Sequence, residues 1–266
     1  MSKAYLKSYG VYVPAGRLTS KTVASLYEKG LPGFKSTSMP ELDEDSLTMA
    51  YEASQKCLAQ EAVKVDAVIL ATTSLPFEYK KGSSLLAQML KIENAMCIDV
   101  GASFLASAEA LWLAEMIIAG GKENVLVVTS ESTTSEPGEE TDFGWGAGAA
   151  ALLVSNEGVA SLNFLSPDYS IEAYDLWKLK GDSKLKFRPE MLDDNFALAM
   201  SRLVKGIGGK EALKKYRFAA IGLNRSRWAK ALGKTGIAAE QVDPVNCSTY
   251  LGHLGAANLG INLALA

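Results

Sequence analysis

The sequence is poor in histidine and cysteine, and this scarcity excludes several kinds of site. The 266 residues include one histidine, His253, and three widely spaced cysteines, Cys57, Cys97 and Cys247. An odd number of isolated cysteines supplies neither a disulfide framework nor a Cys-x-x-Cys zinc knuckle. We therefore expect no metal site and a reducing compartment.

The sequence also lacks an excess of either charge and any long hydrophobic run. It has 27 basic and 30 acidic residues, a formal net charge of -3 and a pI near 5.4. The densest basic run, residues 178–188, is interrupted by an acid and by apolar residues, so no stripe for nucleic-acid phosphates is visible. No stretch approaches the roughly 18 apolar residues that cross a bilayer, and the N-terminus has no apolar core of a signal peptide. The expected protein is cytoplasmic and binds neither nucleic acid nor membranes.

Buried apolar strands alternate with helices along the first part of the chain. The pattern predicts strands at 4–14, 65–73, 95–100 and 124–131, and helices at 20–29, 43–62, 83–91 and 103–119. Asp43 and Asp45 can cap the second of these helices. Such an alternation is typical of a largely parallel sheet with helices on both faces.

The pattern begins again in the second half of the chain. Residues 142–158 form a glycine- and alanine-rich turn followed by a strand, the reverse of the strand-turn-helix order of a dinucleotide fingerprint, so we expect no nucleotide site. A strand at 159–166, a helix at 191–205, a strand at 216–224 and a further helix within 252–266 then follow. The sequence predicts a duplicated βαβα fold with halves at 1–156 and 157–266 in one compact unit. The second half is expected to be shortened at its C-terminal end.

Several stretches have counterparts in a known group of proteins. They are YGVYVPAGRLT, MPELDEDSLTMAYEAS, ATTSLPFEYK, FGWGAGAAAL, DLWK and GHLGAANLGINLALA, and together they span nearly the whole chain. In these stretches the chain resembles the thiolase superfamily, specifically the archaeal-type 3-hydroxy-3-methylglutaryl-CoA (HMG-CoA) synthases and ketoacyl synthase III. The resemblance implies an α/β/α/β/α layered fold and Claisen-type acyl transfer on acyl-CoA.

The resemblance also implies which positions would carry out that chemistry, and four of them depart from the pattern. The cysteine that takes the acyl group is replaced by Ser103, at the corner between a strand and a helix. The histidine of a His-x-x-Asn loop is replaced by Ile221, and only Asn224 is kept. The glutamate expected in HMG-CoA synthases falls at Thr73, and an asparagine of the family is replaced by His253. Because catalytic residues act as a unit, losses of this kind accumulate once the first has occurred.

Three functions remain open at this point. The preferred interpretation is a non-catalytic subunit of a heteromeric acyl-CoA thiolase or synthase, in a structural role or shaping the site of the CoA ester. In the second, the chain is an autonomous serine-dependent acyltransferase or hydrolase, in which His253 activates Ser103 and Asn224 donates to the thioester carbonyl. In the third, the chain binds acyl-CoA without turnover. Against the second, the Ser103 hydroxyl can simply satisfy a local backbone N–H, and Phe104 and Trp145 can fill the pocket.

The resemblance further implies partners and ligands. Superfamily members pair through their central layers, so the chain is expected to pair with itself or with an active thiolase-like subunit. The archaeal-type synthases suggest a small partner with a zinc ribbon and an OB fold. No covalently bound cofactor is expected, and a coenzyme A thioester is the expected ligand.

Overall fold

The computed structural model describes most of the chain. It covers residues 3–28, 34–136, 138, 140–163, 176–179, 181–182, 184–219, 238–243 and 247–266. Ile221 and Asn224 lie outside the described residues, so their predicted roles are not placed in space. Within the described part, no helix has the length and hydropathy needed to cross a membrane.

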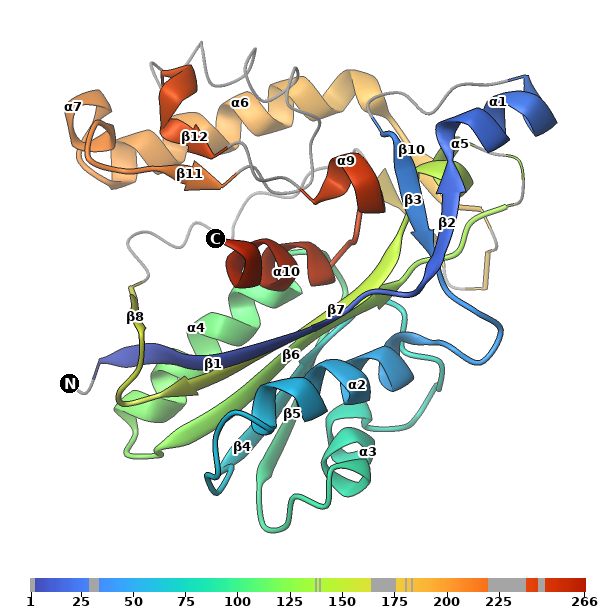
Figure 1. The fold of residues 1–266 in the computed structure, drawn as a ribbon. Helices are drawn as coiled ribbons and strands as arrows, with labels where there is room; N and C mark the ends of the chain where they lie inside the picture. Colours follow the sequence, from blue (N-terminus) through green and yellow to red (C-terminus); the bar gives the residue numbers. More distant parts are fainter. Residues whose placement is uncertain are drawn as a thin grey trace.

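A six-stranded mixed sheet forms the centre of the molecule (Figure 1). Its strands, in order across the sheet, are β5 (Met96–Val100), β4 (Ala67–Ala71), β6 (Asn124–Ser132), β7 (Ala147–Ser155), β1 (Ala4–Tyr12) and β8 (Ala160–Leu162). β5, β4 and β6 are parallel, whereas the pairs β6–β7, β7–β1 and β1–β8 are antiparallel. The prediction of a largely parallel sheet is therefore wrong. Between β6 and β7 the described residues form only the short helix α5 (Glu140–Gly144) and no crossover helix, and β7 runs back beside β6.

Helices cover both faces of this sheet. α2 (Ser46–Leu58) and α3 (Gly82–Met89) lie on one face, and α4 (Ala106–Ala119) and α10 (Ala257–Leu265) lie on the other (Figure 1). Each face has its own buried cluster: Met49, Ala53, Leu86, Leu126 and Leu153 belong to the first. Ile69, Ala110, Ile118, Val127 and Leu152 belong to the second. β4 and residues 125–128 of β6 are continuous apolar runs because both of their faces are covered.

The start of α2 shows how local sequence fixes an element. Asp45 Oδ1 accepts hydrogen bonds from the backbone N–H groups of Leu47 and Thr48, both at 2.8 Å. The Thr48 hydroxyl oxygen accepts from the backbone N–H of Asp45 at 2.7 Å, which completes a capping box. Of the two aspartates that the sequence offered as caps, Asp43 and Asp45, it is Asp45 that caps α2.

The strand predicted at the start of the second half joins the first sheet. β8 pairs with β1, and Val159 N donates to Leu6 O at 2.8 Å. Gly158 makes this possible, since a Cβ there would lie 2.2 Å from Leu6 O. The division into halves at 1–156 and 157–266 stays a prediction.

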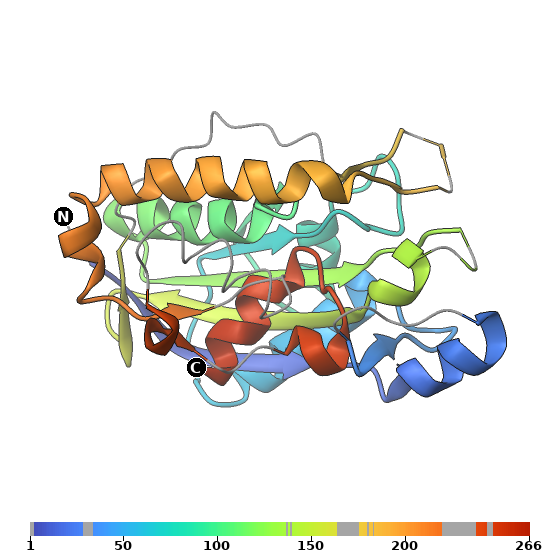
Figure 2. The same cartoon turned by 90° about the horizontal axis from the view of Figure 1, so that it is seen from above.

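The remaining elements lie around this core. A hairpin of β2 (Gly16–Thr19) and β3 (Ser36–Met39) carries α1 (Ser20–Tyr27). The others are β9 (Leu176–Trp177), β10 (Lys186–Phe187), α6 (Pro189–Gly206), α7 (Lys210–Leu213), β11 (Phe218–Ala219), η1 (Ala239–Gln241), β12 (Val242–Asp243) and α9 (Ser248–Leu251). Figure 1 shows α6 and the parallel pair β11–β12 on the side of α4 and α10 that faces away from the six-stranded sheet. Seen from above, α6 runs in nearly the same direction as α4 (Figure 2).

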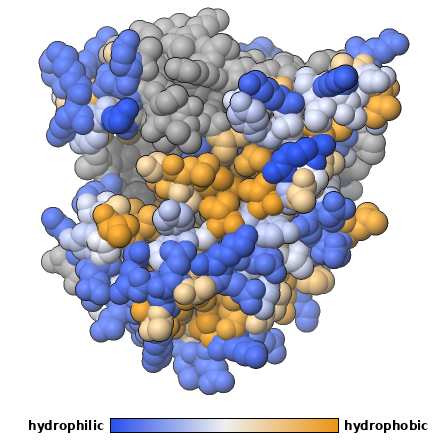
Figure 3. Space-filling view, in the orientation of Figure 1, coloured by the Kyte–Doolittle hydropathy of each residue, from blue (hydrophilic) through white to orange (hydrophobic). Residues whose placement is uncertain are grey.

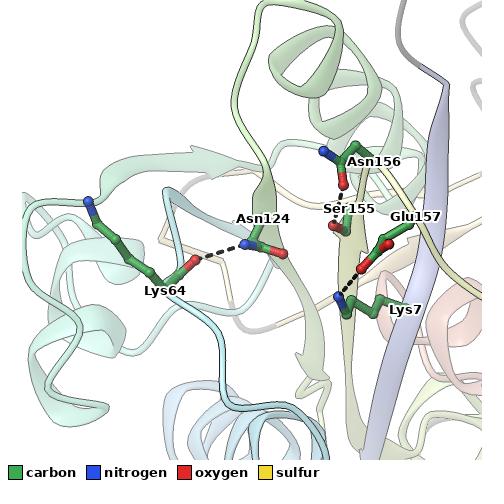
Figure 4. Close-up of polar contacts among 6 residues, drawn as sticks. All are labelled: Lys7, Lys64, Asn124, Ser155, Asn156 and Glu157. Atoms are coloured by element: carbon green, nitrogen blue, oxygen red, sulfur yellow. Dashed lines mark hydrogen bonds and ion pairs between the residues drawn. The ribbon is translucent and has the colours of Figure 1, made fainter.

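The end of the sheet where β6 begins and β7 ends is held by polar contacts (Figure 4). Lys7 and Glu157 form an ion pair at 2.9 Å, and Asn124 Nδ2 donates to Lys64 O at 3.1 Å. The hydroxyl of Ser155 donates to the side chain of its neighbour Asn156 at 3.3 Å. Of the site positions named from the sequence, the described ones, Thr73, Ser103 and His253, lie toward the opposite end of the strands.

Candidate functional site

The candidate residues gather at the carboxyl ends of the three parallel strands. Thr73 follows β4, Ser103 follows β5, and Glu131 lies at the end of β6. The carboxyl ends of parallel strands meet at one edge of a sheet, where open α/β folds bind their ligands. The turn that contains His253 packs against this edge, because Ala256 N donates to Glu131 Oε2 at 3.2 Å.

Ser103 sits in a tight corner between β5 and α4. Ala102, the residue before it, has a positive φ of 71°, a conformation that is costly for a residue with a Cβ. The Ser103 hydroxyl oxygen accepts a hydrogen bond from Leu105 N at 3.2 Å, and the Ser103 carbonyl accepts from Ala106 N at 3.1 Å. The hydroxyl thus serves the local backbone at the start of α4.

His253 is fixed by its backbone and by its ring. Its N–H donates to Gly144 O at 2.9 Å and its carbonyl accepts from Gly146 N at 3.0 Å. In the ring, Nδ1 accepts from Gly255 N at 3.1 Å, so in the neutral imidazole the proton is assigned to Nε2. Burial lowers the pKa of His253 to about 4. The lone pair that a general base needs is therefore already occupied by a backbone donor.

Three aromatic rings, Phe104, Trp145 and His253, form an aromatic cluster beside Ser103. The ring centroids are 4.3 Å apart for Trp145 and His253, 5.0 Å for Phe104 and Trp145, and 5.4 Å for Phe104 and His253. The structure thus brings His253 next to the neighbour of Ser103. No hydrogen bond joins Ser103 and His253, both of which the structure describes. Phe104 and Trp145 pack against the histidine ring, and filling of a substrate pocket by them stays a prediction.

Two of the three cysteines, all of which are described, are poor substitutes for a nucleophile. Burial raises the pKa of Cys57 and raises that of Cys247 to about 11, so neither thiol is ionised near neutral pH. Cys97 lies within β5, half-buried, with its sulfur 3.7 Å from Ala95 O. Among the described residues, no group of three or more His, Cys, Asp or Glu side chains is placed to hold a metal ion.

Glu131 is a site residue that the sequence interpretation missed. Its side chain is fully buried, and its Oε2 accepts from the Thr73 hydroxyl at 2.9 Å and from Thr73 N at 3.3 Å. Position 73 lacks a carboxylate of its own, but it contacts one from the neighbouring strand. The available signal was an acidic residue near the end of a strand with an apolar centre, since a strand covered on both faces buries whatever it carries.

Sequence comparison finds HMG-CoA synthases. The chain is 28% identical over 192 residues to the hydroxymethylglutaryl-CoA synthase of Pyrobaculum neutrophilum, a match that covers 68% of this chain and 55% of that protein. It is 23% identical over 281 residues to that of Methanocella arvoryzae, covering 99% of this chain and 80% of the relative. The chain thus spans about half the length of the Pyrobaculum relatives that it matches. No family model matches the chain.

Structure comparison finds the same fold in ketoacyl synthases. The 3-oxoacyl-(acyl carrier protein) synthase III, FabH, of Pseudomonas aeruginosa PAO1 superposes with a TM-score of 0.84 at 19% identity, covering 99% of this chain and 89% of that one. An HMG-CoA synthase complexed with CoA superposes with a TM-score of 0.82 at 19% identity, covering 98% and 74%. The chain is thiolase-like in fold, and its resemblance to archaeal HMG-CoA synthases and ketoacyl synthase III is confirmed.

Proposed function

We propose that this thiolase-like chain takes part in Claisen-type acyl transfer on acyl-CoA as a subunit that carries no acyl group of its own. It shapes the site of the CoA ester in a heteromeric thiolase or synthase. A partner subunit of the same fold then supplies the nucleophile. The proposal places this chain among proteins whose fold is kept while the acylation chemistry is lost.

The aromatic cluster is the observation that carries this proposal. A serine needs a base within hydrogen-bond reach to attack a thioester at neutral pH. Here the Ser103 hydroxyl is bonded to Leu105 N, and His253 Nδ1 is bonded to Gly255 N. The rings of Trp145 and Phe104 pack against the histidine ring, with centroids 4.3 Å and 5.4 Å from its centroid, and favour this orientation of the imidazole. An autonomous serine enzyme is therefore disfavoured.

Handling of a CoA ester is supported by what the similar proteins bind. The curated relatives are named hydroxymethylglutaryl-CoA synthases, and one structural neighbour is described as complexed with CoA. In this chain the imidazole Nε2–H of His253 is a donor rather than an acceptor. A donor of this kind can donate a hydrogen bond to a thioester carbonyl oxygen, but it cannot act as a base.

The open edge of the sheet is the surface that fits a partner of the same fold. β5 is the outermost strand, with no further strand beside it in the described chain. Apolar side chains flank this edge: Met96 on β5 is 49% exposed, Met116 on α4 is 53% exposed, and Met89 and Leu105 are also exposed. Figure 3 shows apolar surface low on this face, in the region of α3 and β5. An edge strand with exposed apolar neighbours is suited to strand addition by a second chain.

We assign this edge to an active thiolase-like subunit that adds its own edge strand and so continues the sheet. If two copies of this chain pair through β5 instead, the assignment of this edge to a different subunit is wrong. A small protein with a zinc ribbon and an OB fold is proposed as a further member of the complex.

The test is affinity co-purification of the tagged full chain from its source cells. The eluate and the isolated chain are assayed side by side for thiolysis and condensation of acyl-CoA, and both are examined by mass spectrometry for acyl adducts. We expect activity only in the co-purified complex, with the acyl group on a cysteine of the partner. Turnover by the isolated chain together with an acyl adduct on Ser103 would overturn the proposal.

A further inference from the structure

The free edge of β5, the outermost strand of the sheet, is formed by the backbone of Cys97 and Asp99. Met96 N donates to Asp66 O at 2.9 Å, so residues 96, 98 and 100 direct their backbone groups toward β4. Alternate residues of a strand direct their N–H and C=O groups to opposite sides. The N–H and C=O groups of Cys97 and Asp99 therefore point away from β4, toward any strand that is added.

Asp99 places a carboxylate on this edge. Its Oδ2 accepts from Gly82 N and its Oδ1 from Ser83 N, both at 2.7 Å, so the side chain lies on the α3 face of the sheet. The residue is exposed, and no Lys or Arg of the described chain forms an ion pair with it. An added strand would take water away from this carboxylate, and a charge that loses water needs a partner of opposite sign. The edge therefore favours a strand that brings a basic side chain opposite Asp99.

An open cavity of about 400 Å³ lies beside the same edge, where Gln88, Lys91, Asn94 and Cys97 are among the residues that line it. A subunit of the same fold that meets β5 with its own edge strand about a twofold axis adds that strand antiparallel. Side chains two residues apart on it then fall opposite Asp99 and Cys97, on one face. The side chain opposite Cys97 borders the cavity and has room to be long.

A second copy of β5 does not supply these side chains. The strand Met96–Val100 contains no basic residue. In an antiparallel pair centred on Ile98, Asp99 of each copy lies opposite Cys97 of the other. A shift of the centre by one residue puts Asp99 opposite Ala95 or opposite a second Asp99, and like charges directly opposite each other are destabilising. None of these registers pairs the Asp99 carboxylate with a cation.

We propose that Asp99 and the cavity beside Cys97 select the partner of this chain. The added strand belongs to a different chain, and it carries a basic side chain opposite Asp99 and a long side chain two residues further along. The inference rests on the proposed function for the presence of a partner and adds the chemistry by which β5 recognises it. The other face of that strand is apolar, because Ile98 and Val100 pack among hydrophobic side chains on the α4 face.

The first experiment builds the missing base into the chain itself. Cys97→Lys places a lysine opposite Asp99 of a second copy, twice in each antiparallel pair centred on Ile98. One opposite-charge pair across two strands changes a dissociation constant by about 1.4–5-fold, so two change it by about 2–30-fold. Sedimentation equilibrium of the isolated full chain at low salt should show self-association tightened by this factor.

Two further variants are the controls for the self-association experiment. Cys97→Glu changes the same position but brings an acid opposite Asp99, so it should not tighten self-association. Asp99→Asn keeps an oxygen for the N–H groups of α3 and removes the charge, so adding it to Cys97→Lys should abolish the gain. The melting temperature of each variant shows whether it is folded.

The second experiment measures binding of the purified partner subunit by biolayer interferometry, and it does not need any change at Cys97. Asp99→Asn should weaken binding by about 1.4–5-fold and reduce its dependence on salt, because the charge that attracts the partner is gone. Glu41→Gln is the matched control, an exposed acid away from β5, and should change neither quantity.

Three results would overturn the selection by Asp99. Cys97→Lys and Cys97→Glu could self-associate equally, or Asp99→Asn could leave the affinity and salt dependence of partner binding unchanged. The third is self-association of the unmodified chain through β5 that is as tight as that of Cys97→Lys, since such a pair has no base. The self-association experiment decides even where no partner is recovered. None of these readouts depends on which residue carries the acyl group, so an acyl adduct on Ser103 would refute the proposed function and leave them in place.

Discussion

His253 stands out at the residue scale because it combines a deeply lowered pKa with a backbone hydrogen bond to the atom that would be protonated. Burial brings the pKa of His253 to about 4 from its ordinary 6.5, and Gly255 N donates to Nδ1 at 3.1 Å. Protonation of Nδ1 would place two N–H groups against each other. A histidine held in this way is a fixed neutral donor and not a catalytic base near neutral pH.

The lowered pKa of His253 predicts a pH-dependent stability. The unfolded chain binds the proton at about pH 6.5 and the folded chain only at about pH 4. The neutral His253 side chain therefore adds about 3 kcal/mol to the free energy of unfolding above pH 6.5. This stabilisation is lost as the pH falls toward 4. Urea denaturation between pH 4 and pH 7 measures it, and the single histidine gives one NMR titration to follow. His253→Phe should flatten this part of the stability profile; a midpoint near 6.5 in the folded chain would contradict the account.

Gly255 offers a second prediction at this scale. It has a φ of 50°, and a Cβ there would lie 2.4 Å from Glu131 Cγ. Gly255→Ala should lower the free energy of unfolding by about 2–4 kcal/mol, because it adds overpacking to the cost of the left-handed conformation. Gly121→Ala is the matched control, since Gly121 has a φ of 96° and nothing within 4 Å of the added atom. It should cost only about 1–2 kcal/mol, and equal losses for the two variants would show that Glu131 yields to the methyl group.

At the scale of elements, the cap of α2 can be tested directly. Asp45→Ala removes the acceptor for Leu47 N and Thr48 N and should lower the free energy of unfolding by about 1 kcal/mol. Asp43→Ala is the control, because Asp43 is exposed two residues earlier and the capping box does not include it. Chemical denaturation of the two variants gives the comparison. A larger loss for Asp43→Ala would mean that the helix begins elsewhere.

The elements also show what the sequence could and could not predict. Apolar periodicity predicted β4, β6, α2 and α4 near their observed bounds, because each is specified by its own residues. Strand direction was not predictable in the same way. β7 is antiparallel to β6 because the chain between them has no crossover helix and turns straight back, and the residue pattern of the strands does not indicate this. The hairpin β2–β3 was missed because its strands are four residues long.

The same limit applies to the candidate site. The sequence suggested that His253 could activate Ser103, whereas in the structure it is Phe104, the residue next to Ser103, whose ring contacts His253. The contact between Thr73 and Glu131 joins residues 58 positions apart on neighbouring strands. Only pairing of β4 with β6 brings them together, so the carboxylate at position 73 looked absent from the sequence.

At the scale of the whole molecule, the open edge of the sheet at β5 is the surface where the proposed pairing with a partner can be tested. Met96→Lys puts a charge on the exposed edge strand β5, where a second strand would have to bury it. We expect the variant to fold with an unchanged melting temperature and to recover at least tenfold less partner in co-purification. Val159→Lys is the control, an equally polar change at an 81% exposed residue beside β8, the opposite edge strand. If both variants recover the partner equally well, the partner does not bind at β5, and the apolar side chains on that edge must be covered in some other way.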